Sequence, residues 1–152
     1  MKWAQQDLKR YIDAKEYIDT ILMPLIPFQI SKDDEALKGA KQHQAISIII
    51  NEIEKELSGR VMLVPNYYYL KTVDKENEVH RLNMLIDDMA EQPFKHYFFI
   101  TSDLSWKKHE KNLNSEVLLL PGIQSGDIYS EEVAGVIRDQ VSQITELIRS
   151  YW

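Results

Sequence analysis

The stretch Thr20–Phe28, TILMPLIPF, contains the longest apolar run of this chain and sets the expected fold. Three shorter apolar runs follow it, at Val61–Val64, Tyr97–Thr101 and Val117–Leu120, and stretches with helical spacing separate them. Buried strands that alternate with helices are typical of an α/β domain with a mainly parallel sheet. The pattern therefore predicts a fold class, but it does not by itself indicate a chemistry.

Two prolines, Pro24 and Pro27, lie inside this first run. Proline has no N–H group to donate to a sheet ladder, so it is poorly suited to a strand with neighbours on both sides. We therefore expect the first strand either to be split at Pro24 or to have a free edge at that point.

The stretches between the apolar runs carry apolar residues three and four positions apart, which is the spacing of one helix face. For residues 45–50, which include three consecutive isoleucines, a strand is the alternative, but the helical spacing continues on both sides and favours a helix. Gly59 is expected to end that helix. The predicted helices span residues 4–19, 31–58, 75–92, 104–112 and 130–152.

These elements predict a single α/β domain over residues 1–152, in which a four-stranded, mainly parallel sheet has helices on both faces. Right-handed crossovers place the helices on the two sides of such a sheet, which gives a three-layer sandwich of the flavodoxin-like or Rossmann-like kind. With the four strands numbered along the chain, we expect the spatial order 2-1-3-4, as in one half of a flavodoxin-like fold.

The composition narrows the possible functions. A net charge of −6 gives the chain no electrostatic reason to bind nucleic acid or an anionic membrane surface. The chain has no cysteine, which excludes disulfides, thiolate catalysis and cysteine-type zinc sites. The apolar runs are too short to span a membrane and the N-terminal stretch does not resemble a signal peptide, so we expect a cytoplasmic protein.

Polar residues follow the third and fourth predicted strands. In open parallel sheets, ligands bind beyond the carboxyl ends of the strands. Because these two strands are expected to be neighbours, the residues after them are predicted to share one crevice, and its glycines would allow a ligand to approach the backbone closely. The predicted ligand-binding residues are Ser102, Asp103, Gly122, Ser125, Gly126 and Asp127.

The charges near this crevice indicate the kind of ligand. Asp103 and Asp127, together with Glu131 and Glu132 at the start of the last helix, are expected to make the crevice negative. Three carboxylates stand at the start of this helix: Asp127, Glu131 and Glu132. They already satisfy the helix dipole and would repel an anion. A small neutral or cationic ligand is therefore expected in preference to a phosphate.

No strong catalytic, cofactor or metal motif is present. The segment Pro121–Asp127, PGIQSGD, matches neither the dinucleotide-binding nor the Walker pattern. Asp103 is not expected to accept a phosphoryl group, since no acidic pair follows the first strand and no lysine follows the last; we expect it to cap the next helix. The sequence therefore assigns no catalytic residue and no cofactor. It also predicts no metal site, because the histidines lack ligand spacing: His43, His80, His96 and His109.

The aromatic residues leave two alternatives open. Tyr67, Tyr68 and Tyr69, together with Trp106, could form a wall for a flat ligand or a partner, or two of the tyrosines could lie in the core with one at the surface. The tryptophans near the two ends of the chain are expected to cover the ends of the core or to join an interface, such as that of a homodimer.

Three segments resemble the YpiF-like proteins of Bacillus and its relatives: KWAQQDLKRYIDAKEYIDT (residues 2–20), PLIPF (24–28) and ITSDLSW (100–106). The resemblance covers nearly the whole chain. It implies a cytoplasmic bacterial protein. The family has no assigned function or catalytic residues, so no functional residue is carried over from it.

The sequence thus favours a non-catalytic protein that binds a small molecule or another protein. The alternative is a small-molecule enzyme that uses Ser102, Asp103 and the loop 122–127. A deep pocket with Asp103 pointing into it would favour the enzyme, whereas a shallow edge with an exposed aromatic patch would favour protein binding.

Overall fold

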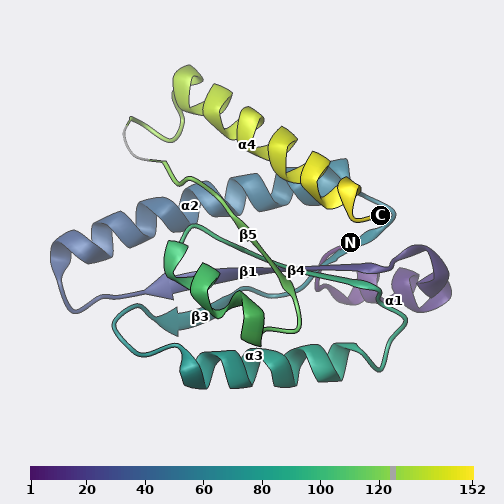
Figure 1. Cartoon of the computed structure of the whole chain (residues 1–152). Helices are drawn as coiled ribbons and strands as arrows, with labels where there is room; N and C mark the ends of the chain where they lie inside the picture. Colours follow the sequence, from purple (N-terminus) through teal and green to yellow (C-terminus); the bar gives the residue numbers. More distant parts are fainter. Residues whose placement is uncertain (124–125) are drawn as a thin grey trace.

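The computed structural model describes residues 1–123 and 126–152, and it has the predicted alternation of strands and helices (Figure 1). The elements in chain order are α1 (Gln5–Asp13), a 3-10 turn η1 (Lys15–Tyr17), β1 (Thr20–Phe28), α2 (Asp33–Glu56), β2 (Val61–Leu63), β3 (Tyr67–Leu70), α3 (Glu76–Met89), β4 (His96–Thr101), a 3-10 segment η2 (Leu104–Asn112), β5 (Glu116–Leu119) and α4 (Glu131–Ser150).

The sheet is parallel at every pairing among these strands, in the order β2-β1-β4-β5. This order confirms the prediction 2-1-3-4, because β4 and β5 are the third and fourth of the predicted strands. The predicted number of strands was wrong, however. A fifth strand, β3, pairs with β1 beyond the point where β2 ends, and its register joins Leu25 to Tyr67 and Phe28 to Leu70.

The length of β1 explains the extra strand. On one side, residues 20–22 of β1 pair with β2, and residues 25–28 pair with β3. The carbonyl of Leu22 accepts a hydrogen bond from the N–H of Val64 at 3.0 Å, so Pro24, two residues further along, faces the same side. The backbone nitrogen of Pro24, which carries no hydrogen to donate, therefore faces the gap between β2 and β3. The strand is continuous, and its free edge lies beside this proline.

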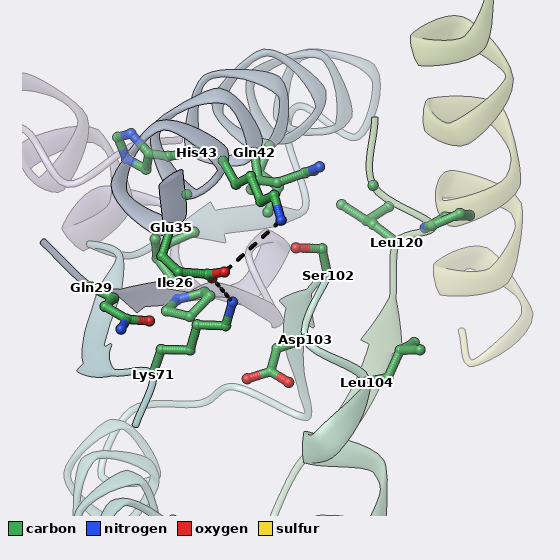
Figure 2. Close-up of a pocket in the computed structure, with 16 residues that line it drawn as sticks. Ile26, Gln29, Glu35, Gln42, His43, Lys71, Ser102, Asp103, Leu104 and Leu120 are labelled. Atoms are coloured by element: carbon green, nitrogen blue, oxygen red, sulfur yellow. Dashed lines mark hydrogen bonds and ion pairs between the residues drawn. The ribbon is translucent and has the colours of Figure 1, made fainter. Parts of the chain in front are cut away.

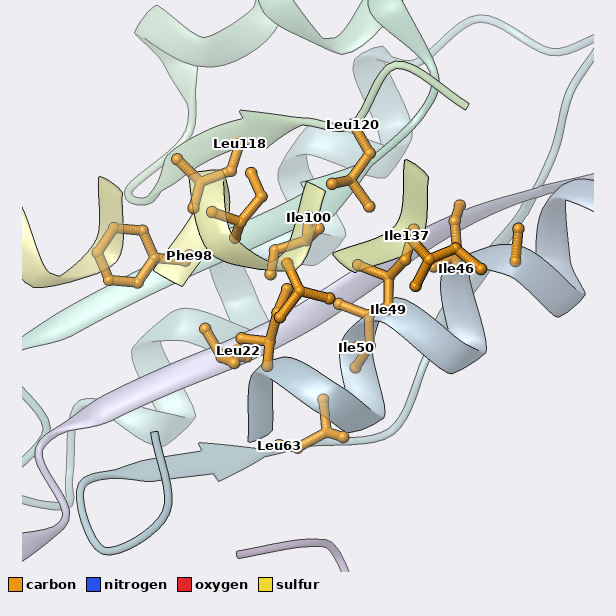
Figure 3. Close-up of a cluster of buried hydrophobic side chains, with 14 of the residues drawn as sticks. Leu22, Ile46, Ile49, Ile50, Leu63, Phe98, Ile100, Leu118, Leu120 and Ile137 are labelled. Carbon is orange, nitrogen blue, oxygen red and sulfur yellow. The ribbon is translucent and has the colours of Figure 1, made fainter. Parts of the chain in front are cut away.

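Helices cover both faces of the sheet, as predicted (Figure 1). The side chains of α2 and α4 pack on one face, where they meet Leu22, Ile100 and Leu118 of the strands (Figure 3). On the other face, α1, α3 and η2 cover Ile21 and Phe99. Alternate residues of β1 and β4 thus belong to different cores, which is the period of two expected of a strand buried on both sides.

The first helix is shorter than predicted. The periodicity indicated one helix over residues 4–19, but α1 ends at Asp13 and a 3-10 turn follows. Ile18 and Asp19 have left the helical path because the N–H groups of Asp19 and Thr20 both donate to the carbonyl of Arg60 at 3.2 Å. The residues predicted to form the last helical turn therefore lead into the sheet instead.

The predicted limits of the long central helix are confirmed within two residues, since α2 spans Asp33–Glu56. Gly59, with φ +92°, lies just beyond its end. The strand alternative for residues 45–50 is wrong. Among residues 1–123 and 126–152, no helix combines the length and the apolar character needed to cross a membrane.

Candidate functional site

A pocket of about 350 Å³ lies at the carboxyl edge of the sheet (Figure 2). Its walls are the N-terminal half of α2 and the segments that follow β1, β3, β4 and β5. Part of its lining is apolar and includes Ile26, Ile46 and Leu120. The volume is at the lower end of the range of small-molecule sites, which is about 300–1,000 Å³.

The structure brings three of the six predicted site residues together in this pocket. Ser102 and Asp103 follow β4 and Gly122 follows β5, and all three line the pocket because β4 and β5 are neighbours. Ser125 lies outside the described residues. Gly126 and Asp127 do not contribute to the lining; Asp127 instead accepts a hydrogen bond from the N–H of Tyr129 at 3.0 Å, in the turn before α4.

The wall formed by α2 was not predicted from the sequence. Its residues repeat at helical spacing and continue the face of the helix that Ile46 begins to bury. Extending the isoleucine stripe towards the N-terminus would have found them, since they stand at the same three-and-four spacing. These residues are Glu35, Lys38, Gly39, Gln42 and His43.

Asp103 is held by four contacts. Its Oδ1 accepts hydrogen bonds from the N–H and the hydroxyl of Ser105, at 3.0 and 2.6 Å. Its Oδ2 accepts one from the Tyr69 hydroxyl at 2.6 Å and lies 3.4 Å from the ammonium of Lys75. A carboxylate has about four lone-pair sites, so three hydrogen bonds and the ion pair with Lys75 leave this group little further capacity to accept. The prediction that Asp103 caps the following segment is confirmed.

These contacts fix the charge of Asp103. Burial alone would raise the pKa of this carboxyl, but the hydrogen bonds from Ser105 and Tyr69 and the nearby charge of Lys75 outweigh it and hold the pKa below its ordinary value. Burial and the bond to the carboxylate raise the pKa of Tyr69, so the tyrosine remains the donor. The Ser102 hydroxyl takes part in none of the four contacts and lies on the pocket side (Figure 2).

Gln42 joins α2 to the segment after β5. Its side-chain amide donates to the carbonyl of Ile123 at 2.8 Å, and its Oε1 accepts from the N–H of the same residue at 3.1 Å. Gly122 has φ +42°, and a Cβ atom built there would lie 2.9 Å from Oε1 of Gln42. Glycine at position 122 therefore has a structural reason, since this pair of hydrogen bonds sets one wall of the pocket.

The charges around the pocket differ from those expected. Asp127, Glu131 and Glu132 do not line it. Its lining carboxylates, Glu35 and Asp103, are matched in number by two lysines, Lys38 and Lys71. The Lys71 ammonium donates to Glu35 at 2.8 Å, and the pair is visible in Figure 2. The lining therefore has no net formal charge, and the argument for a negative crevice does not hold.

The three consecutive tyrosines follow the second of the two alternatives. Tyr67 and Tyr69 are buried, whereas Tyr68 is about half exposed. The Tyr68 hydroxyl contacts the ring nitrogen Nε2 of His43 and accepts from the side-chain amide of Asn66, both at 3.1 Å.

Within the described part of the chain, no three histidine, aspartate or glutamate side chains lie close enough together to hold a metal ion.

Known proteins similar to this chain agree with the resemblance noted in its sequence. The chain is 34% identical over 111 residues to the uncharacterized protein YpiF of Bacillus subtilis (strain 168), which is 72% of this chain and 71% of that protein. No solved structure matches the chain. Residues 9–152 match the family described as "Protein of unknown function (DUF2487)". The chain therefore belongs to the DUF2487 family.

Proposed function

We propose that this protein is a non-catalytic binding protein whose carboxyl-edge pocket holds a small molecule without net charge. The pocket has the size of a small-molecule site, and apolar side chains such as Ile26 line it together with polar ones such as Gln42 and Ser102, so it can both bury and orient a small molecule. The match between two lining carboxylates and two lysines removes the preference for either sign of charge, so an uncharged or zwitterionic molecule suits it best.

The state of Asp103 carries the proposal against the enzyme alternative. A pocket with a carboxylate at its wall would suit general-base catalysis, which needs a free lone pair and a pKa near the working pH. Here the four contacts with Ser105, Tyr69 and Lys75 occupy both oxygens, and they hold the pKa below its usual range. We therefore assign Asp103 a structural role, and Ser102 the role of a hydrogen-bonding contact to the ligand.

Binding of four small probes tests this proposal. Adenosine is uncharged, phenylalanine is a zwitterion, AMP is an anion and agmatine is a cation, and each can be titrated by ligand-detected NMR at low salt. We expect adenosine or phenylalanine to bind more tightly than both charged probes. Ser102→Ala should weaken that binding severalfold, whereas Ser142→Ala, at an exposed position of α4 outside the pocket, should leave it unchanged.

Three results would contradict the proposal. Tightest binding of AMP or agmatine would show that the pocket selects a charge. Binding that Ser102→Ala leaves unaltered would place the ligand elsewhere. Conversion of a probe into a product by the wild type, lost in Ser102→Ala, would support the enzyme alternative.

Binding of a protein partner and formation of a homodimer stay predictions. Of the three consecutive tyrosines, Tyr68 alone is exposed, and its hydroxyl already bonds to His43 and Asn66.

A further inference from the structure

Gly39 has no structural reason to be glycine. It lies inside α2, where glycine is less favourable than alanine because a glycine loses more conformational entropy when the chain folds. Its φ is not in the left-handed region, and a Cβ atom built on it meets nothing within 4 Å. Neither the backbone nor the packing therefore explains why the helix has no side chain at this position.

The open space beside Gly39 is the pocket. Gly39 is part of the pocket wall, one turn before His43 and on the same face of α2 as Gln42. A side chain here would project into the volume between α2 and Ser102. Gly122, in contrast, is required by its φ of +42° and by the nearby amide of Gln42.

A second helical glycine provides a comparison. Gly135 lies in α4, and a Cβ atom there would make an ordinary contact of 3.7 Å with the Arg138 side chain. It does not line the pocket. The two glycines share the cost of glycine in a helix but differ in what lies beside them.

We propose that Gly39 determines the size and shape of the ligand by letting its flat body lie directly against the backbone of α2. This inference rests on the function proposed above. It narrows the ligand to a compact, uncharged or zwitterionic molecule about the size of a nucleoside, with one flat apolar side. That side would face Gly39 and Ile46 of α2, and the polar edge would face the Ser102 hydroxyl, which comes from the segment after β4.

Three variants test the inference: Gly39→Ala, Gly39→Leu and the control Gly135→Ala. Adenosine and phenylalanine serve as probes, titrated by calorimetry, and thermal unfolding without probe is recorded for each variant. Both alanine variants should raise the unfolding midpoint, since alanine is the better helix former and neither Cβ clashes. Gly39→Leu should remain folded, because its side chain enters open space.

The affinity for the probes should distinguish the variants. Gly39→Ala should weaken the binding of whichever probe the wild type binds more tightly. Gly39→Leu should weaken that binding more than about tenfold, the loss that a single misplaced methylene can cause in a fitted pocket. Gly135→Ala should bind as the wild type does. A structural role of Gly39 alone would move the unfolding midpoint without this graded loss of binding.

The failures of the two proposals can be told apart. If the wild type binds neither probe, the proposed function and this inference both fail. If the wild type binds a probe and Gly39→Leu binds it equally well, the inference fails and the proposed function stands. A loss of binding in Gly135→Ala of the same size would likewise overturn the role of Gly39.

Discussion

The two halves of α2 present the same face to very different surroundings. The C-terminal half is buried against the sheet and α4 through Ile46, Ile49 and Ile50, which Figure 3 shows, and through Ile53. The N-terminal half continues this face with polar residues and one glycine, namely Glu35, Lys38, Gly39, Gln42 and His43. Ile46 belongs to both halves, since it lies in the core and lines the pocket.

The difference follows from where the strands end. Paired residues of β1 and β4 extend to Pro24 and Ile100, and the N-terminal half of α2 reaches beyond them over the carboxyl edge. Beyond them the sheet narrows to β1 and β3, which continue as far as Phe28 and Leu70, so the helix face has less sheet on which to pack and apolar side chains would gain less by burial. One continuous helix thus builds the core with one half and the wall of a pocket with the other.

The largest effect is expected in the buried half. Ile53 is fully buried, and Ile53→Ala should lower the free energy of unfolding by about 2–5 kcal/mol, the cost of emptying a core site. The neighbouring exchange Glu52→Ala, at a half-exposed position, should change it by less than about 0.5 kcal/mol. Urea unfolding of both variants checks this, and equal midpoints would mean that Ile53 does not contribute to the core.

Asp103→Asn should have the next largest effect, and the effect should depend on pH. At pH 7 the exchange leaves the Lys75 ammonium, about 10% exposed, without its partner, which should cost on the order of 3 kcal/mol. The folded state lowers the pKa of Asp103, so its contribution is complete above the unfolded value near 4 and is lost as pH falls through the folded value.

Urea unfolding at several pH values measures this dependence. The wild type and Asp103→Asn should differ most at pH 5–7 and converge as the pH falls from about 4 towards 2. Ser102→Ala serves as the control and should run parallel to the wild type, because Ser102 does not bond to this carboxylate. A difference that stays constant down to pH 2 would show that the charge of Asp103 is not what stabilises the fold.

In the pocket half of α2, Gly39→Ala should have a smaller effect of opposite sign. It should raise the free energy of unfolding by about 0.5–1 kcal/mol, the usual difference between the two residues inside a helix. The empty space around the built Cβ atom is the reason to expect the whole gain. Urea unfolding that shows a loss would mean that the space beside Gly39 is filled in the folded protein.

Much of the fold was predictable because its signals are local. The apolar runs located β1, β2, β4 and β5, and the flavodoxin-like pattern supplied their order. The strand β3 was missed because all four of its residues are aromatic or apolar, so its alternation of buried and exposed positions leaves no trace in the sequence. The early end of α1 was missed because it depends on bonds to Arg60, far along the chain.

The candidate site divides in the same way. Ser102, Asp103 and Gly122 were predictable, since the carboxyl ends of neighbouring parallel strands must meet at one edge. The lysines beside the carboxylates were not, because Lys75 lies 28 positions before Asp103 and Lys71 lies 36 positions after Glu35. Ion pairs between such distant residues become visible only when the helices and strands are placed.

The smallest effect on stability is expected at Glu35, in the exposed half of the comparison. Its carboxylate accepts from Lys71 at 2.8 Å and lies 3.9 Å from the Lys38 ammonium. The hydrogen bond and charge of Lys71 lower the pKa of Glu35, but solvent reaches all three side chains and screens them. We expect Glu35→Gln to leave the unfolding midpoint unchanged within error at 0.15 M salt.

The same exchange should change which ligand the pocket binds, because it leaves Lys38 and Lys71 with one lining carboxylate, Asp103, and gives the pocket lining a net positive charge. AMP should then gain affinity relative to adenosine, and 0.5 M salt should abolish the gain. A ratio of AMP to adenosine affinity equal to that of the wild type at low salt would show that the balance of charges at this edge does not select the ligand.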